Sequence, residues 1–228
     1  MKALAVDSAT NRLTVSAKND DKYFSMIFDI GMHQSQTLIP AIDYVLAKVG
    51  LTSDELDFTC LCIGPGSFTG LRIAVSALKA IELAKNVPVY AVSSLKTYAE
   101  PFFKFSLPIL SCVDAKKDKF YASIYEKDVQ LWPDGDYEIS EIAEKISGYK
   151  EIIIAGPDSK LLKEILEKEN VCKNVKLITL KAQVDTGESL LNLASEMFSK
   201  NEESLKDFEG PVYLRASEAE IKLSKGSL

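Results

Sequence analysis

Histidine is almost absent from this sequence, since His33 is the only one among 228 residues. One chain therefore cannot build a metal centre that needs two histidine ligands. No Ser-His-Asp or Cys-His arrangement has a spacing that supports nucleophilic catalysis either. His33 stands directly before the apolar positions of an expected helix, so a hydrogen-bonding role at the start of that helix is favoured over catalysis.

Cysteine is also sparse, and its spacing differs from the C-x-x-C pairs that usually mark zinc sites. The four cysteines are Cys60, Cys62, Cys112 and Cys172. Three of them lie in apolar runs typical of strands, where a thiol behaves as a small hydrophobic side chain. We expect all four to be reduced and structural, with a metal or redox role as the less favoured alternative.

Positive charge is in the minority: 27 Lys and Arg residues stand against 33 Asp and Glu residues, which gives a formal net charge of -6 and a pI near 5.0. No overall positive field draws such a chain onto nucleic acid or an anionic membrane. A role on nucleic acid would therefore need a partner protein. The sequence also lacks a secretory signal and any apolar run of the ~20 residues that a membrane span requires, so we expect a cytoplasmic protein.

The first hundred residues contain short apolar or β-branched runs separated by polar turns, followed by longer runs with helical spacing. We predict strands at 2–7, 13–18, 23–30, 56–64 and 87–93, and helices at 33–50 and 71–85. The first three strands are expected to pair antiparallel. Pro40 should kink the first helix in its early turns, and Gly50 should end it. The resulting order is βββαβαβ.

The second half repeats this order less regularly. We predict strands at 107–115, 119–128, 129–133, 137–139, 151–156 and 175–180, and helices at 139–148, 159–169 and 187–200. Prolines and phenylalanines between Ala99 and Pro108 mark a plausible hinge. The pattern indicates an α/β fold with a first lobe at 1–102 and a second, smaller lobe with a C-terminal tail at 103–228. The helix at 187–200 is a candidate to pack back on the first lobe.

A glycine-rich stretch, GPGSFTGLRI, lies between a predicted strand and a predicted helix. Backbone N–H groups in such a turn, beside the positive end of the helix dipole, suit a phosphate or carboxylate. The stretch is neither a Walker loop nor G-x-G-x-x-G, so a tight turn with Ser67 or Thr69 as helix cap is an equally weighted alternative. In either case we expect Gly64, Gly66 and Gly70 to serve backbone shape, with φ > 0 disfavouring a β-branched residue in place of Gly70.

A second polar loop follows the first predicted strand, where Asp7, Ser8 and Thr10 stand in the string VDSAT. Actin-like phosphotransferases use an acidic residue with hydroxyls between their opening strands as a phosphate-binding hairpin. Both loops leave the carboxyl ends of apolar strands, so we expect them to lie near each other at a cleft. Arg72, in the helix after the glycine-rich stretch, is expected to contact an acidic or phosphate group. Together these residues are candidates for a nucleotide or phosphate site.

The two long helices of the first lobe each carry apolar residues away from their inward face. On the first helix, the residues expected inside are Leu38, Ile42, Val45, Leu46 and Val49. On the second helix, they are Ile73, Ala74, Ala77, Leu78, Ala80, Ile81 and Ala84. The residues that fall among polar ones are Pro40, Tyr44, Ala47, Val75 and Leu83. Scattered surface apolar residues are common, but two neighbouring patches favour a helical interface with a partner.

Several strings resemble the TsaB family, also called YeaZ: AVDSAT, HQSQTLIPAID, GPGSFTGLRI, VDAKKDKFYASIYE and PVYLR. The likeness spans almost the whole chain, and GPGSFTGLRI is a specific string. TsaB belongs to the bacterial machinery that places a threonylcarbamoyl group on the adenosine beside the anticodon of tRNAs. The resemblance implies two actin-like lobes of the ribonuclease H-like (ASKHA) type, with mixed sheets flanked by helices.

The resemblance also implies what this chain lacks. In the catalytic paralogue, TsaD, two histidines one helical turn apart bind iron or zinc, and the aligned positions here are Ser94 and Tyr98. Neither is a normal ligand for these metals. The implied role is therefore a non-catalytic scaffold with no metal and no assigned cofactor of its own, any ATP or ADP lying at the interface of the complex.

A TsaB-like subunit is expected to pair with TsaD through its first lobe and to help recruit the ATPase TsaE. It would reach tRNA only through the complex, and form a homodimer when alone. The interface residues expected are His33, Pro40, Tyr44, Ala47, Val75 and Leu83. Two alternatives stay open. One is an ATP- or phosphate-using enzyme of the actin or sugar-kinase type, supported by Asp7 and the glycine-rich stretch, and the other, less favoured, is a peptidase.

Overall fold

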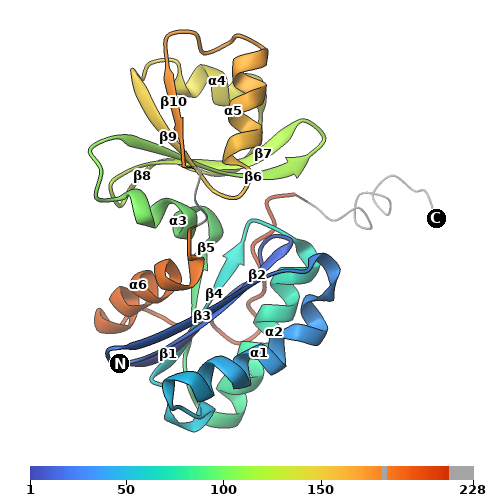
Figure 1. The fold of residues 1–228 in the computed structure, drawn as a ribbon, viewed down its shortest axis with the longest axis vertical. Helices are drawn as coiled ribbons and strands as arrows, with labels where there is room; N and C mark the ends of the chain where they lie inside the picture. The colour runs from blue at the N-terminus through green and yellow to red at the C-terminus, as the bar shows by residue number, and fades with distance from the viewer. Residues whose placement is uncertain (181–183, 216–228) are drawn as a thin grey trace, which may run out of the picture.

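Two lobes lie one above the other along the long axis of the molecule (Figure 1). The computed structural model describes residues 1–180 and 184–215. Each lobe contains a five-stranded mixed sheet flanked by helices, which confirms the predicted α/β class. Among the described residues, no helix is both long and apolar enough to cross a lipid bilayer.

The sheet of the first lobe has the strand order β3-β2-β1-β4-β5. Its strands are β1 (Lys2–Asp7), β2 (Arg12–Asn19), β3 (Lys22–Asp29), β4 (Phe58–Gly64) and β5 (Val89–Ser93). The first three pair antiparallel, as predicted, and β4 and β5 add in parallel beside β1. The helices α1 (Gln34–Val49) and α2 (Phe68–Lys85) provide the crossovers that lead into β4 and β5.

Both faces of this sheet are covered, because its strands carry apolar residues on both sides. Leu4 and Val6 of β1 lie in one core cluster with residues of α1 and α2. Ala3 and Ala5 of the same strand lie in a second cluster with the helix α6 (Thr186–Ser199). The sheet therefore forms the middle layer of three.

The sheet of the second lobe has the strand order β10-β9-β6-β7-β8. Its strands are β6 (Pro108–Lys116), β7 (Lys119–Glu126), β8 (Val129–Glu138), β9 (Glu151–Ala155) and β10 (Lys176–Thr179), with helices α4 (Ile139–Ile146) and α5 (Ser159–Lys168). Counted from its own first strand, this order and its antiparallel and parallel pairs match those of the first lobe. The two lobes therefore repeat one topology.

The helix that follows each fifth strand covers the sheet of the other lobe. The helix α3 (Ser94–Ala99) follows β5 but packs on β6 and β7, whereas α6 follows β10 but packs on β1 and β2. Tyr98 of α3 accordingly shares a core cluster with Val113 of β6. This exchange joins the two lobes through buried side chains.

The first helix follows its sequence pattern closely. Gly50 ends α1 with φ at 74° and donates its N–H to the carbonyls of Leu46 and Ala47, as expected of a left-handed helix cap. Pro40 lies inside the helix. The residues predicted to face inward, Leu38, Ile42, Val45, Leu46 and Val49, are all buried.

The structure differs from the sequence prediction at two elements. The first is the short helix α3, which was not predicted because it has too few residues to show a helical period. It is capped by the Ser93 side chain, which accepts from the N–H of Lys96 at 3.3 Å. The second element, β8, is one long strand rather than two weak ones. Its Pro133 and Gly135 are tolerated because β8 is an edge strand whose pairing with β7 shifts at this place.

Short 3-10 turns lie in the connections between the helices and strands. The 3-10 turns are η1 (Gly31–His33), η2 (Ser53–Glu55) and η3 (Glu100–Phe102). All four cysteines are buried and unpaired, as expected.

The last described residues, 205–215, form a strap across both lobes. The N–H of Leu205 donates to the carbonyl of Val89 at 2.7 Å, and the N–H of Val212 donates to the carbonyl of Ile63 at 2.9 Å. Arg215, at the end of the strap, reaches Asp136 of the second lobe. The whole string PVYLR, residues 211–215, thus lies in this strap.

Candidate functional site

The two loops chosen from the sequence lie directly against each other. The hydroxyl of Ser8 donates to the carbonyl of Gly70 at 2.8 Å, and the N–H of Ser67 donates to the carbonyl of Ala9 at 2.6 Å. The prediction that these loops share one end of the first lobe is confirmed.

Close backbone packing explains the glycines of the glycine-rich stretch. A β-carbon on Gly66 would lie 2.2 Å from the carbonyl oxygen of Ala9, and one on Gly70 would lie 2.0 Å from that of Ser8. Among these glycines only Gly64 has a left-handed φ, at 125°. The expected φ > 0 is therefore wrong for Gly70, which is required because the neighbouring hairpin touches it.

The backbone N–H groups of Ser67 and Gly70, at the start of α2, are engaged within the protein. Ser67 is the N-cap, and its hydroxyl accepts from the N–H of Gly70 at 3.3 Å, so the capping interpretation is confirmed for Ser67. Thr69 is exposed and lies inside the helix. The N–H of Leu71 donates to the carbonyl of Ser67, and that of Ser67 donates to Ala9. These groups are not free to hold a phosphate.

Arg72 pairs with aromatic rings, and its expected acidic contact is absent among the described residues. Its Nε donates to the hydroxyl of Tyr213 at 2.9 Å, and its guanidinium lies 3.9 Å from the centre of the Phe68 ring. Tyr213 itself stacks on Phe68, with ring centres 4.5 Å apart. The strap therefore binds the first turns of α2 through Tyr213.

Asp7 is a shielded carboxyl at the end of β1, with 4% of its surface exposed. Burial raises its pKa, because the charged form loses hydration. The N–H of Ala9 donates to its Oδ1 at 3.0 Å. This bond and the polar groups of Thr186, Cys62 and Tyr98 around the carboxylate favour the charged form, so they partly offset the rise in pKa.

Hydrogen bonds to Thr10 fix the hairpin that carries Asp7. The N–H of Arg12 donates to Thr10 Oγ1 at 3.2 Å, and Nε2 of Gln34 donates to the Thr10 carbonyl at 2.7 Å. Gln34 is the first residue of α1, so the hairpin is held against that helix.

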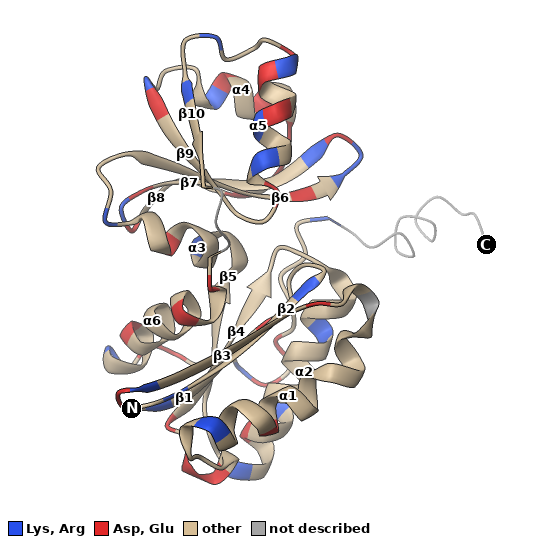
Figure 2. Cartoon of the chain, in the orientation of Figure 1, with Lys and Arg blue, Asp and Glu red and all other residues tan. Residues whose placement is uncertain are grey.

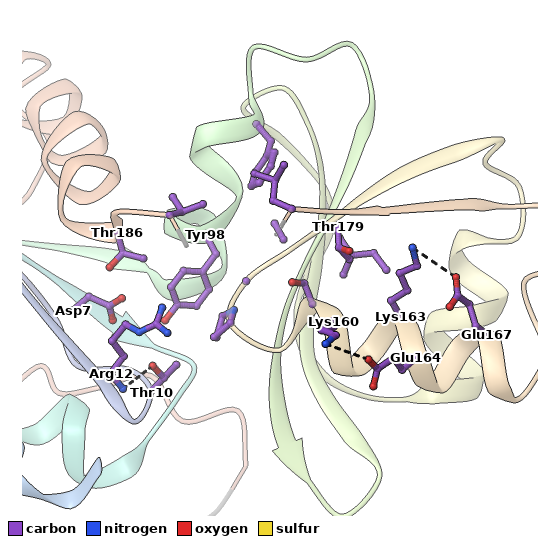
Figure 3. Close-up of a pocket in the computed structure, with 18 residues that line it drawn as sticks. Asp7, Thr10, Arg12, Tyr98, Lys160, Lys163, Glu164, Glu167, Thr179 and Thr186 are labelled. Carbon is purple, nitrogen blue, oxygen red and sulfur yellow. Dashed lines mark hydrogen bonds and ion pairs between the residues drawn. The ribbon is translucent and has the colours of Figure 1, made fainter. Parts of the chain in front are cut away.

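A cavity of about 600 Å³ opens between the lobes beside this hairpin. Figure 3 shows Asp7, Thr10, Arg12 and Tyr98 gathered at one end of it, with Lys160 and Lys163 of α5 on the other side. Asp7 and Thr10 are indicated by the sequence, whereas Arg12, at the start of β2, has no local signal that marks it. Tyr98 is indicated only through the resemblance.

The second lobe presents a matching set of residues. Asp114 ends the apolar part of β6 as Asp7 ends β1, and its Oδ1 accepts from the N–H two residues on, at 2.7 Å. Gly156-Pro157-Asp158-Ser159 repeats Gly64-Pro65-Gly66-Ser67, and Gly156 also has a left-handed φ, at 102°. Asp158 accepts from the N–H of Asp114 at 2.8 Å. Comparing the two halves for internal repeats would have found this set.

Two residues of α3, Ser94 and Tyr98, stand where the family resemblance expects the metal ligands of TsaD. Ser94 and Tyr98 are both buried, and neither hydroxyl has a hydrogen-bond partner among the described residues. No group of three or more His, Cys, Asp or Glu side chains that could hold a metal occurs within 1–180 and 184–215. Neutral hydroxyls are poor substitutes for the imidazoles that iron or zinc prefers.

An apolar surface, the α1–α2 face, covers the outer sides of the two long helices of the first lobe. Leu83 is 90% exposed, Ile39 53% and Tyr44 47%, and Pro40 and Ala47 are exposed beside them. Figure 2 shows α1 and α2 as largely uncharged. Part of this face is hollowed into a groove lined by residues such as Leu38, Ile39, Ile73 and Ala77.

Some expectations for these helices need correction. Val75 is partly buried against the protein's own core, because α1 packs beside it, so it belongs less to the outer face than predicted. Ala80 and Ala84, expected to face inward, are exposed, because only one narrow stripe of α2 is fully buried. His33 is the N-cap of α1, but its side chain makes no capping bond, and its carbonyl accepts from Thr37.

Comparisons with known proteins agree with this arrangement. The profile of the TsaD family, described as tRNA N6-adenosine threonylcarbamoyltransferase, matches residues 30–223. The chain is 24% identical over 233 residues to the tRNA threonylcarbamoyladenosine biosynthesis protein TsaB of Escherichia coli, covering 98% of each. It is 26% identical over 231 residues to TsaB of Bacillus subtilis, covering 97% of each.

Solved structures show the same fold. YeaZ from Pseudomonas aeruginosa has a TM-score of 0.72 and 21% identity, covering 93% of this chain and 99% of that one. A second structure, of a protein with similarity to peptidase YeaZ from the same organism, has a TM-score of 0.76 and 22% identity, covering 94% and 99%. With a family profile over most of its length and full-length TsaB relatives, the chain belongs to the TsaB (YeaZ) family, the branch of TsaD-like proteins that takes part in tRNA threonylcarbamoyladenosine biosynthesis.

Proposed function

We propose that this chain is a non-catalytic scaffold subunit for the transfer of a threonylcarbamoyl group to the adenosine beside the anticodon of tRNA. It acts in the cytoplasm by forming a heterodimer with TsaD, holding TsaD in an active shape, and helping to recruit TsaE. It meets tRNA only through that complex. Any ATP or ADP lies at the interface of the complex.

The α1–α2 face is the observation that carries this proposal. A cluster of exposed Leu, Ile, Tyr and Pro side chains on two adjacent helices costs hydration free energy unless another protein covers it. Leu83, at 90% exposed, gains almost its full burial free energy from a partner, about 1.5–3 kcal/mol. When TsaD is absent, the same face is available to a second copy of this chain.

The chemistry of the cleft supports the absence of catalysis. Ser94 and Tyr98 offer hydroxyls where the family resemblance expects the metal-binding histidines of TsaD, and no cluster of three or more His, Cys, Asp or Glu side chains that could hold a metal occurs among the described residues. The N–H groups of Ser67 and Gly70, at the start of α2, are bonded within the protein.

An ATP- or phosphate-using enzyme is the second candidate, favoured by one observation, the position of Asp7 at the cavity between the lobes. No comparable observation favours a peptidase. Reconstitution separates the candidates. The scaffold should restore tRNA modification when added to TsaD and its companions, and should show no ATP hydrolysis or tRNA modification alone. Turnover by the isolated chain would refute it.

A double variant, Tyr44→Glu with Leu83→Glu, tests the partner surface. Both side chains are about half exposed or more, so the variant should keep the circular dichroism spectrum and melting temperature of the parent. It should no longer co-purify with TsaD or self-associate, because two carboxylates would be buried unpaired in the interface. Unfolding of the double variant would assign these side chains to the core.

A matched control is Val129→Glu with Leu131→Glu on the edge strand β8. These residues are 58% and 46% exposed and lie in the other lobe. The control should bind TsaD normally. If instead both double variants bind equally well, the partner surface does not lie on α1 and α2.

A further inference from the structure

Two ionisable side chains of opposite type, Asp7 and Arg12, line the cavity between the lobes. Lys160 pairs with Glu164 at 3.8 Å, and Lys163 pairs with Glu167 at 3.6 Å, so the charges on α5 balance within that helix. Among the described residues, no ion pair involves Asp7 or Arg12, although both line the cavity.

Hydroxyl groups near Asp7 make no hydrogen bond of normal geometry. Tyr98 is 5% exposed and lines the cavity, and its hydroxyl lies near the Asp7 carboxylate without such a bond to any described residue. The same holds for Oγ1 of Thr186. Figure 3 shows Tyr98 directed toward Arg12, with Thr186 close to Asp7. Buried polar groups are normally hydrogen-bonded, so unbonded hydroxyls at a cavity can complete their hydrogen bonds with a bound molecule.

The remaining wall of the cavity is partly apolar. Phe102 and Ile154 are almost fully buried and still line it, and Val184 adds to this side. A ligand with a charged end toward the hairpin therefore has room for an aliphatic group toward these side chains.

We propose that the cleft binds a small zwitterion, an α-amino acid with an aliphatic side chain. Its ammonium faces Asp7, its carboxylate faces Arg12, and the Tyr98 hydroxyl donates to that carboxylate. A guanidinium is well suited to a carboxylate because it offers paired donors. A phosphate group fits less well, since Asp7 would repel it and the N–H groups of Ala9 and Ser67 are already bonded within the protein.

L-leucine is the probe, compared with two analogues that each lack one charge. Titration of the full chain by NMR should show saturable binding of L-leucine, with at least about tenfold weaker binding of 4-methylpentanoate, which lacks the amine, and of 3-methylbutylamine, which lacks the carboxylate. No saturable shift with L-leucine up to about 10 mM would refute the proposal. Binding of inorganic phosphate as tight as that of L-leucine would refute it as well.

Variants separate ligand contacts from structural effects. Arg12→Gln should weaken L-leucine binding about tenfold or more, since it removes a charged hydrogen bond. Tyr98→Phe should weaken binding without lowering the melting temperature, because the hydroxyl makes no hydrogen bond of normal geometry to a described residue in the free protein. A lower melting temperature with unchanged affinity would contradict its role as a ligand contact. Lys200→Gln, which removes an exposed cation at the end of α6, is the control and should bind normally.

Binding at the cleft is independent of the scaffold role. The Tyr44→Glu with Leu83→Glu variant should bind L-leucine like the parent, because its changes lie on the outer helices. Failure of one proposal would therefore leave the other standing.

Discussion

Arg215 and Asp136 form a bidentate ion pair that connects the end of the strap to the second lobe. Nε and Nη2 of Arg215 donate to the two carboxylate oxygens of Asp136, both at 2.7 Å. Nη1 donates to the carbonyl of Ala115, also at 2.7 Å. Both side chains are less than a quarter exposed, so this pair is worth more than an ordinary surface ion pair.

Removing this pair should loosen the junction of strap and second lobe. We expect Arg215→Gln to lower the free energy of unfolding by about 2 kcal/mol, because Asp136 would be left partly buried without its partner. Urea denaturation measures this. A double-mutant cycle with Asp136→Asn should give a coupling of about 1 kcal/mol or more.

An exposed ion pair provides the comparison for that measurement. Lys176 pairs with Glu151 at 3.0 Å, but their side chains are 67% and 40% exposed. Lys176→Gln should change stability by less than about 0.5 kcal/mol. If Lys176→Gln and Arg215→Gln lower the free energy of unfolding equally, the Arg215–Asp136 pair contributes no more to stability than an exposed ion pair.

Gly70 should tolerate no side chain. Gly70→Ala places a β-carbon 2.0 Å from the carbonyl oxygen of Ser8, so the hairpin or α2 must move. We expect a loss of about 2–4 kcal/mol in the free energy of unfolding, measured by urea denaturation.

Gly148 offers a matched control. A β-carbon there meets nothing within 4 Å, and its φ is not left-handed. Gly148→Ala should be neutral or stabilise by up to about 1 kcal/mol. A neutral Gly70→Ala would mean that the hairpin and the loop adjust freely to each other.

Asp7 should make stability depend on pH. Its raised pKa means that the folded protein keeps the proton to higher pH than the unfolded chain, whose value is near 3.8. The contribution of Asp7 to stability therefore falls as the pH rises from 3.8 through the raised pKa.

Asp7→Asn removes this ionisation and can still accept from the N–H of Ala9. Urea denaturation of both proteins from about pH 4 to about pH 8 should show the variant gaining stability relative to the parent as the pH rises. Parallel curves over this range would show that Asp7 ionises alike in the folded and unfolded states.

The cysteines should be unreactive while the protein is folded. Burial raises the pKa of the Cys60, Cys62 and Cys112 thiols, so almost no thiolate is available to react. A thiol-specific disulfide reagent should label these three only as fast as the protein unfolds, and all four cysteines at once in denaturant. Rapid labelling of any of the three without denaturant would contradict their burial.

The sequence by itself determined most elements of the fold. Strand β1 follows from a short apolar run, and helix α1 follows from the helical spacing of its apolar residues. Both patterns depend only on neighbours along the chain. The end of α1 at Gly50 and the cap of α2 at Ser67 are equally local. The outward position of Tyr44 and Leu83 followed from the same helical geometry.

Only the tertiary structure decided which distant residues meet. Gly70 is required because the hairpin of β1 and β2 presses on it, and Arg72 binds Tyr213, which lies 141 residues further along the chain. The exchange of α3 and α6 brings Tyr98 to the cleft beside Asp7. No local period encodes such contacts, because they form only when whole sheets and helices pack together, and packing depends on the shapes of both partners.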